Sequence, residues 1–239
     1  MLIVKYQYFM DERQQKLLKA IVDEYVETAS PVGSLEVAEK YFPELSSATI
    51  RNAMAQLEEV GLITQPYTSA GRIPTASGYR TYIDYFVNEG KISSKDKKQL
   101  EALELDIFPL AIKNLAKKIS ELSDCAVIAA FSDSDLYYTG ISNLFSQPEF
   151  NISGWVYSMS GIIDGLDRVL SKFYFQVSNE PKILVGSENP FGDLASIITV
   201  KAPLKEKEIL VGILGPLRMD YCKNLGLIDY SKEIISNLK

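Results

Sequence analysis

The sequence predicts an α+β protein with a helical N-terminal part and a strand-rich C-terminal part. Apolar residues recur with a helical period through the first 90 residues. Beyond residue 124, short β-rich runs alternate with turn residues. The 239 residues suffice for one large domain or two modest ones, and the 46% hydrophobic and 23% charged fractions are typical of globular proteins.

Composition excludes several classes of function. A net charge of -6 argues against a protein that coats nucleic acid or membranes by bulk charge, although a local basic patch remains compatible with it. Without histidine, the chain cannot build a His-containing zinc site or a His-dependent catalytic group. Cys125 and Cys222 match no metal spacing and fit a reducing compartment. We therefore expect a cytoplasmic protein that is not an enzyme, with no metal, no cofactor and no membrane segment.

Two helices are expected at the start, after a flexible tail at residues 1–9. Asp11 and Gln14 form a plausible capping pair for the first helix, which ends before Pro31. Its apolar face consists of Leu17, Leu18, Ile21, Val22, Tyr25 and Val26. A shorter helix begins at Ser34. Its apolar residues are Leu35, Val37, Ala38 and Tyr41.

A third helix follows, capped by Ser46 or Ser47, and Gly61 is well placed to stop it. One side is apolar and consists of Ile50, Ala53, Met54, Leu57 and Val60. The opposite side carries small and polar residues, which are Ala48, Arg51, Asn52, Ala55 and Gln56. This helix therefore has one face for a core and one face for solvent or a partner.

Residues 62–65 and 72–74 read as two short strands around a tip of small residues. Thr75 then caps a fourth helix that runs to about Asn88. Its apolar face consists of Tyr79, Tyr82, Ile83 and Phe86. Three short helices followed by a hairpin give the order of a winged helix-turn-helix domain, which we assign to residues 10–90.

The rest of the chain is expected to form a helical linker at residues 91–123 and a sheet domain at residues 124–239. The linker contains amphipathic segments at residues 97–105 and 110–122. The predicted strands are "CAVIAAF", "FYFQV", "KILVG", "ASIITV" and "EILVGIL". A helix from Ser160 and one or two helices over residues 219–238 complete the domain.

The third helix and the hairpin are candidates for DNA binding. Arg51 can pair with guanine, and Asn52 and Gln56 with adenine. The remaining candidates are expected at phosphates or the minor groove: Ser47 and Thr49 at the helix start, and Tyr67, Ser69, Gly71, Arg72 and Arg80 on or after the hairpin. No acid lies between residues 60 and 83, so the positive side of the domain would face DNA. The alternative for this helix is a solvated amphipathic face.

Two further constellations have structural interpretations. Asp133 and Asp135 in "FSDSD" could support a metal or acid–base site, but a third carboxylate at useful spacing is lacking, so a solvated turn is favoured. Arg218 and Asp220 in "GPLRMDY" favour an ion pair and a helix cap, with a ligand or partner contact as the alternative.

Five blocks resemble HrcA, the family of bacterial heat-shock repressors, and they occur in the family's order. They are "PVGS" (residues 31–34), "SSATIRNAMAQLEEVGLI" (46–63), "QPYTSAGRIPTASGYRTYID" (65–84), "YTGISNLFSQPEF" (138–150) and "GPLRMDY" (215–221). The resemblance implies a homodimeric repressor of chaperone operons that binds an inverted-repeat operator and is released on heat stress. It also implies a GAF-like effector domain at residues 124–239 and a dependence on the GroEL chaperonin.

The sequence departs from the family pattern at three places. Tyr67 replaces a histidine, and Ala53 replaces an acidic residue. Relatives carry an inserted dimerisation domain before the block at residues 138–150, where this chain has only residues 124–137. The effector domain is therefore shortened, and residues 110–122 or the C-terminal helices would have to supply the dimer contacts. The alternative function is a winged-helix regulator whose C-terminal domain senses a small molecule.

Overall fold

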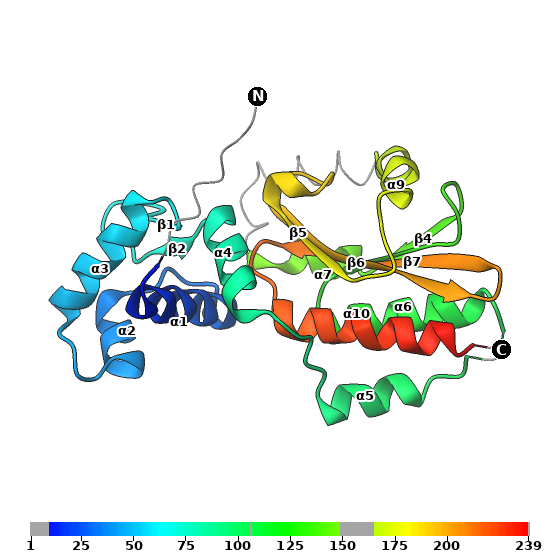
Figure 1. Cartoon of the computed structure of the whole chain (residues 1–239), viewed down its shortest axis with the longest axis horizontal. Helices are drawn as coiled ribbons and strands as arrows, with labels where there is room; N and C mark the ends of the chain where they lie inside the picture. Colours follow the sequence, from blue (N-terminus) through cyan, green and yellow to red (C-terminus); the bar gives the residue numbers. More distant parts are fainter. Residues whose placement is uncertain (1–9, 106, 149–164, 239) are drawn as a thin grey trace. The chain divides into compact units, whose positions relative to one another are not determined.

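The chain folds as two units, Met1–Asn88 and Glu89–Lys239 (Figure 1). The structure is a computed structural model that describes residues 10–105, 107–148 and 165–238. The tail expected at residues 1–9 lies outside the described residues. Each unit has its own buried core and is described by itself.

The N-terminal unit has the predicted winged helix-turn-helix order. Its elements are α1 (Glu12–Thr28), α2 (Ser34–Tyr41), α3 (Ser47–Glu59), β1 (Ile63–Thr64), β2 (Ile73–Pro74) and α4 (Ala76–Phe86). The side chains of Asp11, Ser46 and Thr75 accept backbone amides at the starts of α1, α3 and α4. The strands are shorter than expected, with two residues each, so the hairpin has a very short ladder.

Side chains from all four helices fill the core of this unit. The fully or nearly fully buried ones are Leu17, Leu18, Ile21, Val22, Val37, Ile50, Met54, Leu57, Tyr79 and Ile83. Burial of each large apolar side chain stabilises the fold by about 1.5–3 kcal/mol. Two apolar residues predicted for this core are exposed instead. Leu35 is 61% exposed because it lies out of helical phase with Val37 and Tyr41, and Val60 is 38% exposed at the end of α3.

A buried carboxylate ties α1 to α2. Glu24 is only 4% exposed, and it accepts hydrogen bonds from Lys40 Nζ (2.5 Å) and Tyr41 Oη (2.8 Å). The hydrogen bond from Lys40 is the largest cause that lowers the pKa of Glu24. A buried charge requires such partners, so Glu24 contributes to stability in its ionised form.

The C-terminal unit is a five-stranded antiparallel sheet with the order β4-β3-β7-β6-β5, which confirms the predicted α+β class. The strands are β3 (Ala126–Ala130), β4 (Leu136–Thr139), β5 (Lys182–Val185), β6 (Ala195–Leu204) and β7 (Lys207–Pro216). The helices are α5 (Ser94–Glu101), α6 (Leu110–Ser123), α7 (Ile141–Ser146), α9 (Leu166–Tyr174), η2 (Gly186–Glu188) and α10 (Tyr221–Ser236). The likeness to a GAF domain stays a prediction.

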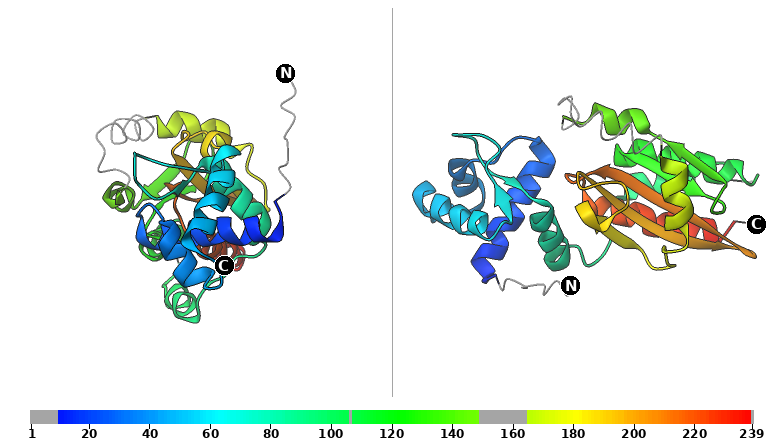
Figure 2. Two further views of the ribbon diagram at one scale, coloured as in Figure 1. Left: turned by 90° about the vertical axis from the view of Figure 1, so that its left-hand side faces the viewer. Right: turned by 90° about the horizontal axis from the view of Figure 1, so that it is seen from above.

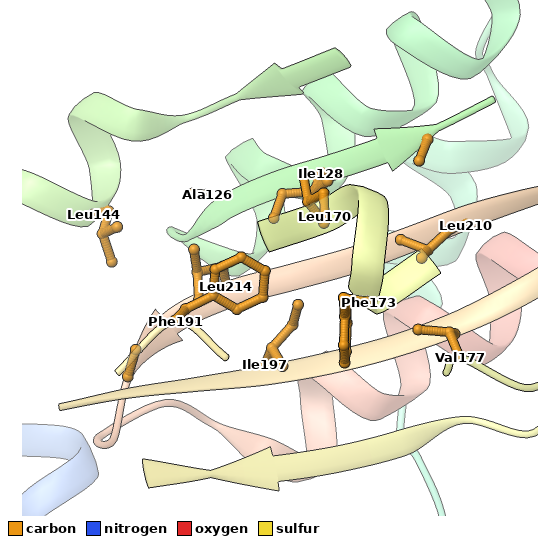
Figure 3. Packing of buried hydrophobic residues seen from close by; sticks show 12 residues of the cluster. Ala126, Ile128, Leu144, Leu170, Phe173, Val177, Phe191, Ile197, Leu210 and Leu214 are labelled. Atoms are coloured by element: carbon orange, nitrogen blue, oxygen red, sulfur yellow. The ribbon is translucent and has the colours of Figure 1, made fainter. Parts of the chain in front are cut away.

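Helices cover both faces of this sheet, so its central strands are buried on both sides. The long β6–β7 hairpin lies over α10 and α6 (Figures 1 and 2). On the other face, α7 and α9 contribute Leu144, Leu170 and Phe173 to an apolar cluster with Phe191. Figure 3 shows these side chains directed toward Ile197, Leu210 and Leu214 of the central strands, among others.

Three parts of the C-terminal unit differ from the prediction. The run "FYFQV" is not a strand, because Phe173 lies on the buried face of α9 and Phe175 follows the helix at 71% exposure. Strand β4 was not anticipated. The segment expected as a linker at residues 91–123 is helical but belongs to this unit, because Ile112, Leu115 and Ile119 of α6 are buried and the helix packs on β3.

The remaining C-terminal expectations concern the helices. Of the helix expected from Ser160, residues 160–164 lie outside the described ranges, and the described helix α9 begins at Leu166 after Gly165. The expected helices over residues 219–238 form one helix, α10. Within the described ranges, no helix combines the length and the hydropathy needed to cross a bilayer.

Candidate nucleic-acid interface

The solvent face of α3 carries the side chains predicted to read bases. Arg51, Asn52 and Gln56 are all exposed, and Ala48 and Ala55 beside them leave the backbone accessible. The three polar side chains form no hydrogen bond or ion pair with any residue that the structure describes. Because long polar side chains without internal partners are available to a ligand, this face is suited to an edge of paired bases.

The start of α3 has the geometry of an anion site only in part. Ser46, rather than Ser47, is the cap: its Oγ accepts the Thr49 amide at 3.1 Å and lies 2.8 Å from Thr49 Oγ1. Ser47 and Thr49 are half-buried. Amides in the first turn of a helix favour a bound phosphate. The contact of Ser47 and Thr49 with the DNA backbone stays a prediction.

The hairpin between β1 and β2 forms the wing, which we define as residues 65–72. Tyr67 is 66% exposed at its tip, and Ser69 is exposed with a left-handed φ of 68°. Gly71 lies against the loop before α2, where an added Cβ would be 2.5 Å from the carbonyl carbon and oxygen of Val32. Only glycine fits this approach.

The arginines of the wing and of α4 are engaged within the domain. Arg72 donates from Nε (2.9 Å) and pairs through Nη2 (2.8 Å) with Glu58 Oε2, and its side chain is 20% exposed. Arg80 pairs with Asp84 one turn later in α4 at 2.7 Å. Their predicted contacts with DNA stay predictions, whereas Arg51 needs no internal pair to be broken before it binds.

A notch of about 550 Å³ lies between α3, the wing and the start of α2. Its lining includes Arg51, Ser69, Gly71, Arg72 and the exposed Leu35. The sequence-based site thus missed Leu35, although its position out of phase with the rest of α2 could have revealed it. Glu58 was missed as well, because its partners come from a hairpin that begins several residues later in the chain.

The two other constellations lie in the C-terminal unit, and their proposed roles stay predictions. Asp133 and Asp135 lie exposed in the β3–β4 turn, and the part of the chain that the structure describes contains no group of three or more metal-ligating His, Cys, Asp or Glu residues. Asp220 caps α10 by accepting the Lys223 amide at 2.9 Å. Arg218 donates to Gln147 Oε1 at 2.8 Å, which joins the end of β7 to the segment after α7.

Two family models match the chain, and their boundaries agree with the two units. Residues 10–84 match the model described as "Winged helix-turn-helix transcription repressor, HrcA DNA-binding". Residues 89–224 match the "HrcA protein C terminal domain". The second match alone covers more than half of the 239 residues.

Curated relatives named "Heat-inducible transcription repressor HrcA" align with the chain. The one from Acetivibrio thermocellus is 42% identical over 128 residues, which cover 52% of this chain but only 36% of the relative. The one from Carboxydothermus hydrogenoformans is 52% identical over 88 residues, which cover 37% of this chain and 26% of the relative. These alignments thus span about a third of the relatives' length or less.

A third relative, from Thermoanaerobacter pseudethanolicus, aligns over 333 positions at 25% identity and covers 96% of this chain and 97% of the relative. About a hundred of those positions have no residue of this chain opposite them, so the chain is shorter than that relative. A solved structure described only as a hypothetical protein shares the fold, with a TM-score of 0.78, 18% identity, and coverage of 95% of this chain and 98% of the other. Because the two family models together match both units of the fold, this chain belongs to the HrcA family.

Proposed function

We propose that the chain is a DNA-binding transcription repressor rather than an enzyme. The observation that carries the proposal is the face of α3, where Arg51, Asn52 and Gln56 are exposed beside a wing within a domain that matches a repressor family. The relatives are named as heat-inducible repressors, which supports repression of stress-response genes as the biological role.

The geometry of the N-terminal unit supports one way of reading DNA. Helix α3 enters the major groove, where Arg51 donates two hydrogen bonds to a guanine edge and the two amide side chains pair with adenines. The tip of the wing, with Tyr67 and Ser69, contacts the adjacent backbone or minor groove. The small side chains of Ala48 and Ala55 allow α3 to approach the groove floor closely.

A single domain of this size offers few base contacts, so we propose that the chain acts as a homodimer on an inverted repeat. Two symmetric half-sites would lie about one helical turn apart, or a multiple of that distance. Heat would release the operator through loss of the folded dimer or of a chaperonin partner such as GroEL. The two-domain architecture supports this division into a reading head and an effector domain.

The test begins with selection of binding sequences from a random duplex pool by the wild-type chain. We expect an enriched inverted repeat and a dimer mass in light scattering. Arg51→Ala should weaken binding to the selected duplex by roughly 1–3 kcal/mol, which is about fivefold to 150-fold, and relax the preference at one base position. Arg13→Ala, which removes the same charge from an exposed site on α1, serves as the control. Equal losses for both variants on selected and random DNA would refute the assignment of α3.

A cavity favours a second candidate function, in which the C-terminal unit senses a small molecule. It measures about 420 Å³ and opens between the start of α6 and the β6–β7 turn. Its lining is Leu105, Phe108, Ala111, Leu204, Lys205, Glu206, Lys207 and Leu238. The walls are mostly apolar and the charged rim carries both signs, Lys205 and Lys207 with Glu206 between them, so the cavity suits a largely apolar ligand. A metabolite that binds this unit raises its melting temperature, and a thermal-shift screen measures that effect.

A further inference from the structure

The carboxylate of Glu58 joins α3 to both arms of the wing. Its Oε1 accepts the backbone amide of Gln65 at 3.1 Å, directly after β1. Its Oε2 accepts Nε of Arg72 at 2.9 Å and lies 2.8 Å from Nη2 of Arg72, directly before β2. Both oxygen atoms are therefore occupied by the wing, and the guanidinium is held along its Nε–Nη2 edge.

The wing depends on this carboxylate because its own ladder is short. Strands β1 and β2 pair only two residues each, and Pro74 in β2 has no amide to donate. A two-stranded hairpin of this length is not stable by itself in water. Beside the ladder, Thr75 N donates to Leu62 O at 3.0 Å, and the wing itself is held by the bridge between Val32 and Arg72 and by Glu58.

Inside the wing, the side chains of Gln65 and Arg72 meet at the carbonyl oxygen of Ala70. Gln65 Nε2 donates to Ala70 O at 3.1 Å, and Arg72 Nη1 reaches that oxygen at 3.5 Å. The tip with Tyr67 and Ser69 is thus flanked by Gln65 and Arg72, and Glu58 holds the first by its backbone amide and the second by its guanidinium. Movement of the Glu58 carboxylate would move the tip relative to Arg51 on the same helix.

We propose that Glu58 is a positioning residue for DNA binding: it fixes the wing at a set distance from the base-reading face of α3. In this role Arg72 is a strut between helix and wing, and its charge is already neutralised by Glu58. The inference rests on the proposed function. The inference predicts that removal of the Glu58 charge weakens DNA binding. If charge alone mattered, removal of an acid from a DNA-binding face should strengthen binding.

Glu59 supplies a matched control one residue away. It is exposed, and it forms no hydrogen bond or ion pair with the residues described by the structure. Glu58→Gln and Glu59→Gln remove the same charge from the same helix. We expect Glu58→Gln to weaken binding to the selected duplex roughly tenfold, the size expected for loss of charge-assisted hydrogen bonds. Glu59→Gln should leave binding unchanged or slightly tighter.

Anisotropy titrations with the full chain, well below its melting temperature, measure these effects. A double-mutant cycle with Arg72→Gln separates positioning from a general loss of stability: the double variant should bind no more weakly than either single variant. Additive losses, or wild-type affinity in Glu58→Gln, would overturn the inference. Where Glu58→Gln does not fold, Arg72→Gln and the conservative Glu58→Asp probe the same pair, and wild-type affinity in both would overturn it.

Failure of the proposed function gives a different result. If the wild-type chain itself enriches no duplex from the pool, both proposals fall together. If the wild-type chain binds and Arg51→Ala weakens it, but Glu58→Gln does not, only the positioning role of Glu58 is refuted.

Discussion

Replacement of Gly71 by alanine is the sharpest test of how the wing is seated. An added Cβ would lie 2.5 Å from the carbonyl carbon and oxygen of Val32 and 2.6 Å from the carbonyl carbon of Pro31. All three are backbone atoms, so no side-chain rotation relieves the overlap. The wing strand must move by about 1 Å to restore an ordinary contact distance.

Such a shift breaks the bridge that Arg72 forms with Val32. The bridge consists of two hydrogen bonds, from Val32 N to Arg72 O and from Arg72 N to Val32 O, both 2.9 Å. Each contributes about 1 kcal/mol, and overpacking adds about 1–3 kcal/mol. Gly71→Ala should therefore lower the free energy of unfolding of the N-terminal unit by roughly 3–5 kcal/mol and weaken binding to the selected duplex.

Urea unfolding measures the stability, and hydrogen exchange at the amides of Val32 and Arg72 measures the bridge directly. Gly33→Ala is the control: Gly33 lies on the loop that Gly71 packs against, its φ is -85°, and an added Cβ meets nothing within 4 Å. It should cost less than about 1 kcal/mol. If Gly71→Ala stays within 0.5 kcal/mol of the wild type, about the spread of an ordinary surface substitution, with both amides still protected, the close approach does not hold the wing.

Two further predictions concern titratable groups. The Lys40 hydrogen bond lowers the pKa of Glu24. The contribution of ionised Glu24 to the free energy of unfolding is therefore present above the ordinary glutamate pKa and is lost as the pH falls through the lowered value. Glu24→Gln should cost about 1–2 kcal/mol at pH 7 and progressively less in acid. Urea unfolding measures this cost against Glu39→Gln, at an exposed site on α2, and a constant difference at every pH would contradict it. Burial raises the pKa of the Cys125 thiol to about 12, so iodoacetamide at pH 8 should modify the half-buried Cys222 first, as read by mass spectrometry. Simultaneous modification of both thiols in the native protein would show that Cys125 is accessible.

Helical periodicity predicted the architecture of the N-terminal unit because the reading face and the core face of α3 are both local properties. Ile50, Met54 and Leu57 repeat at helical spacing and are buried, whereas Arg51 and Asn52 fall between them and are exposed. The caps were predictable for the same reason, since an oxygen at the cap reaches an amide only three residues away.

Contacts between distant segments were not predictable from such patterns. The pair of Glu58 and Arg72 spans 14 residues and exists only because the hairpin folds back on α3. The same limit applies to α6. Its sequence predicts an amphipathic linker, because nothing local shows that β3 packs against its apolar face. "FYFQV" was mistaken for a strand because aromatic and β-branched residues favour strands, whereas burial of Phe173 against Phe191 (5.9 Å between ring centroids) favours the helical end of α9.

The turn between β3 and β4 is a point where the sheet could accept extra residues. Ala130 and Leu136 are paired across the ladder, and the turn closes on itself through the amide of Phe131, which donates to Asp135 O at 2.8 Å. Paired strand ends lie only about 5 Å apart, a gap that a folded domain with neighbouring termini can bridge. The strands on both sides of this turn are already paired, so a domain inserted there would not need to contribute side chains to the core of the sheet. Extra residues at this turn would therefore leave the pairing of β3 with β4 and with β7 unchanged.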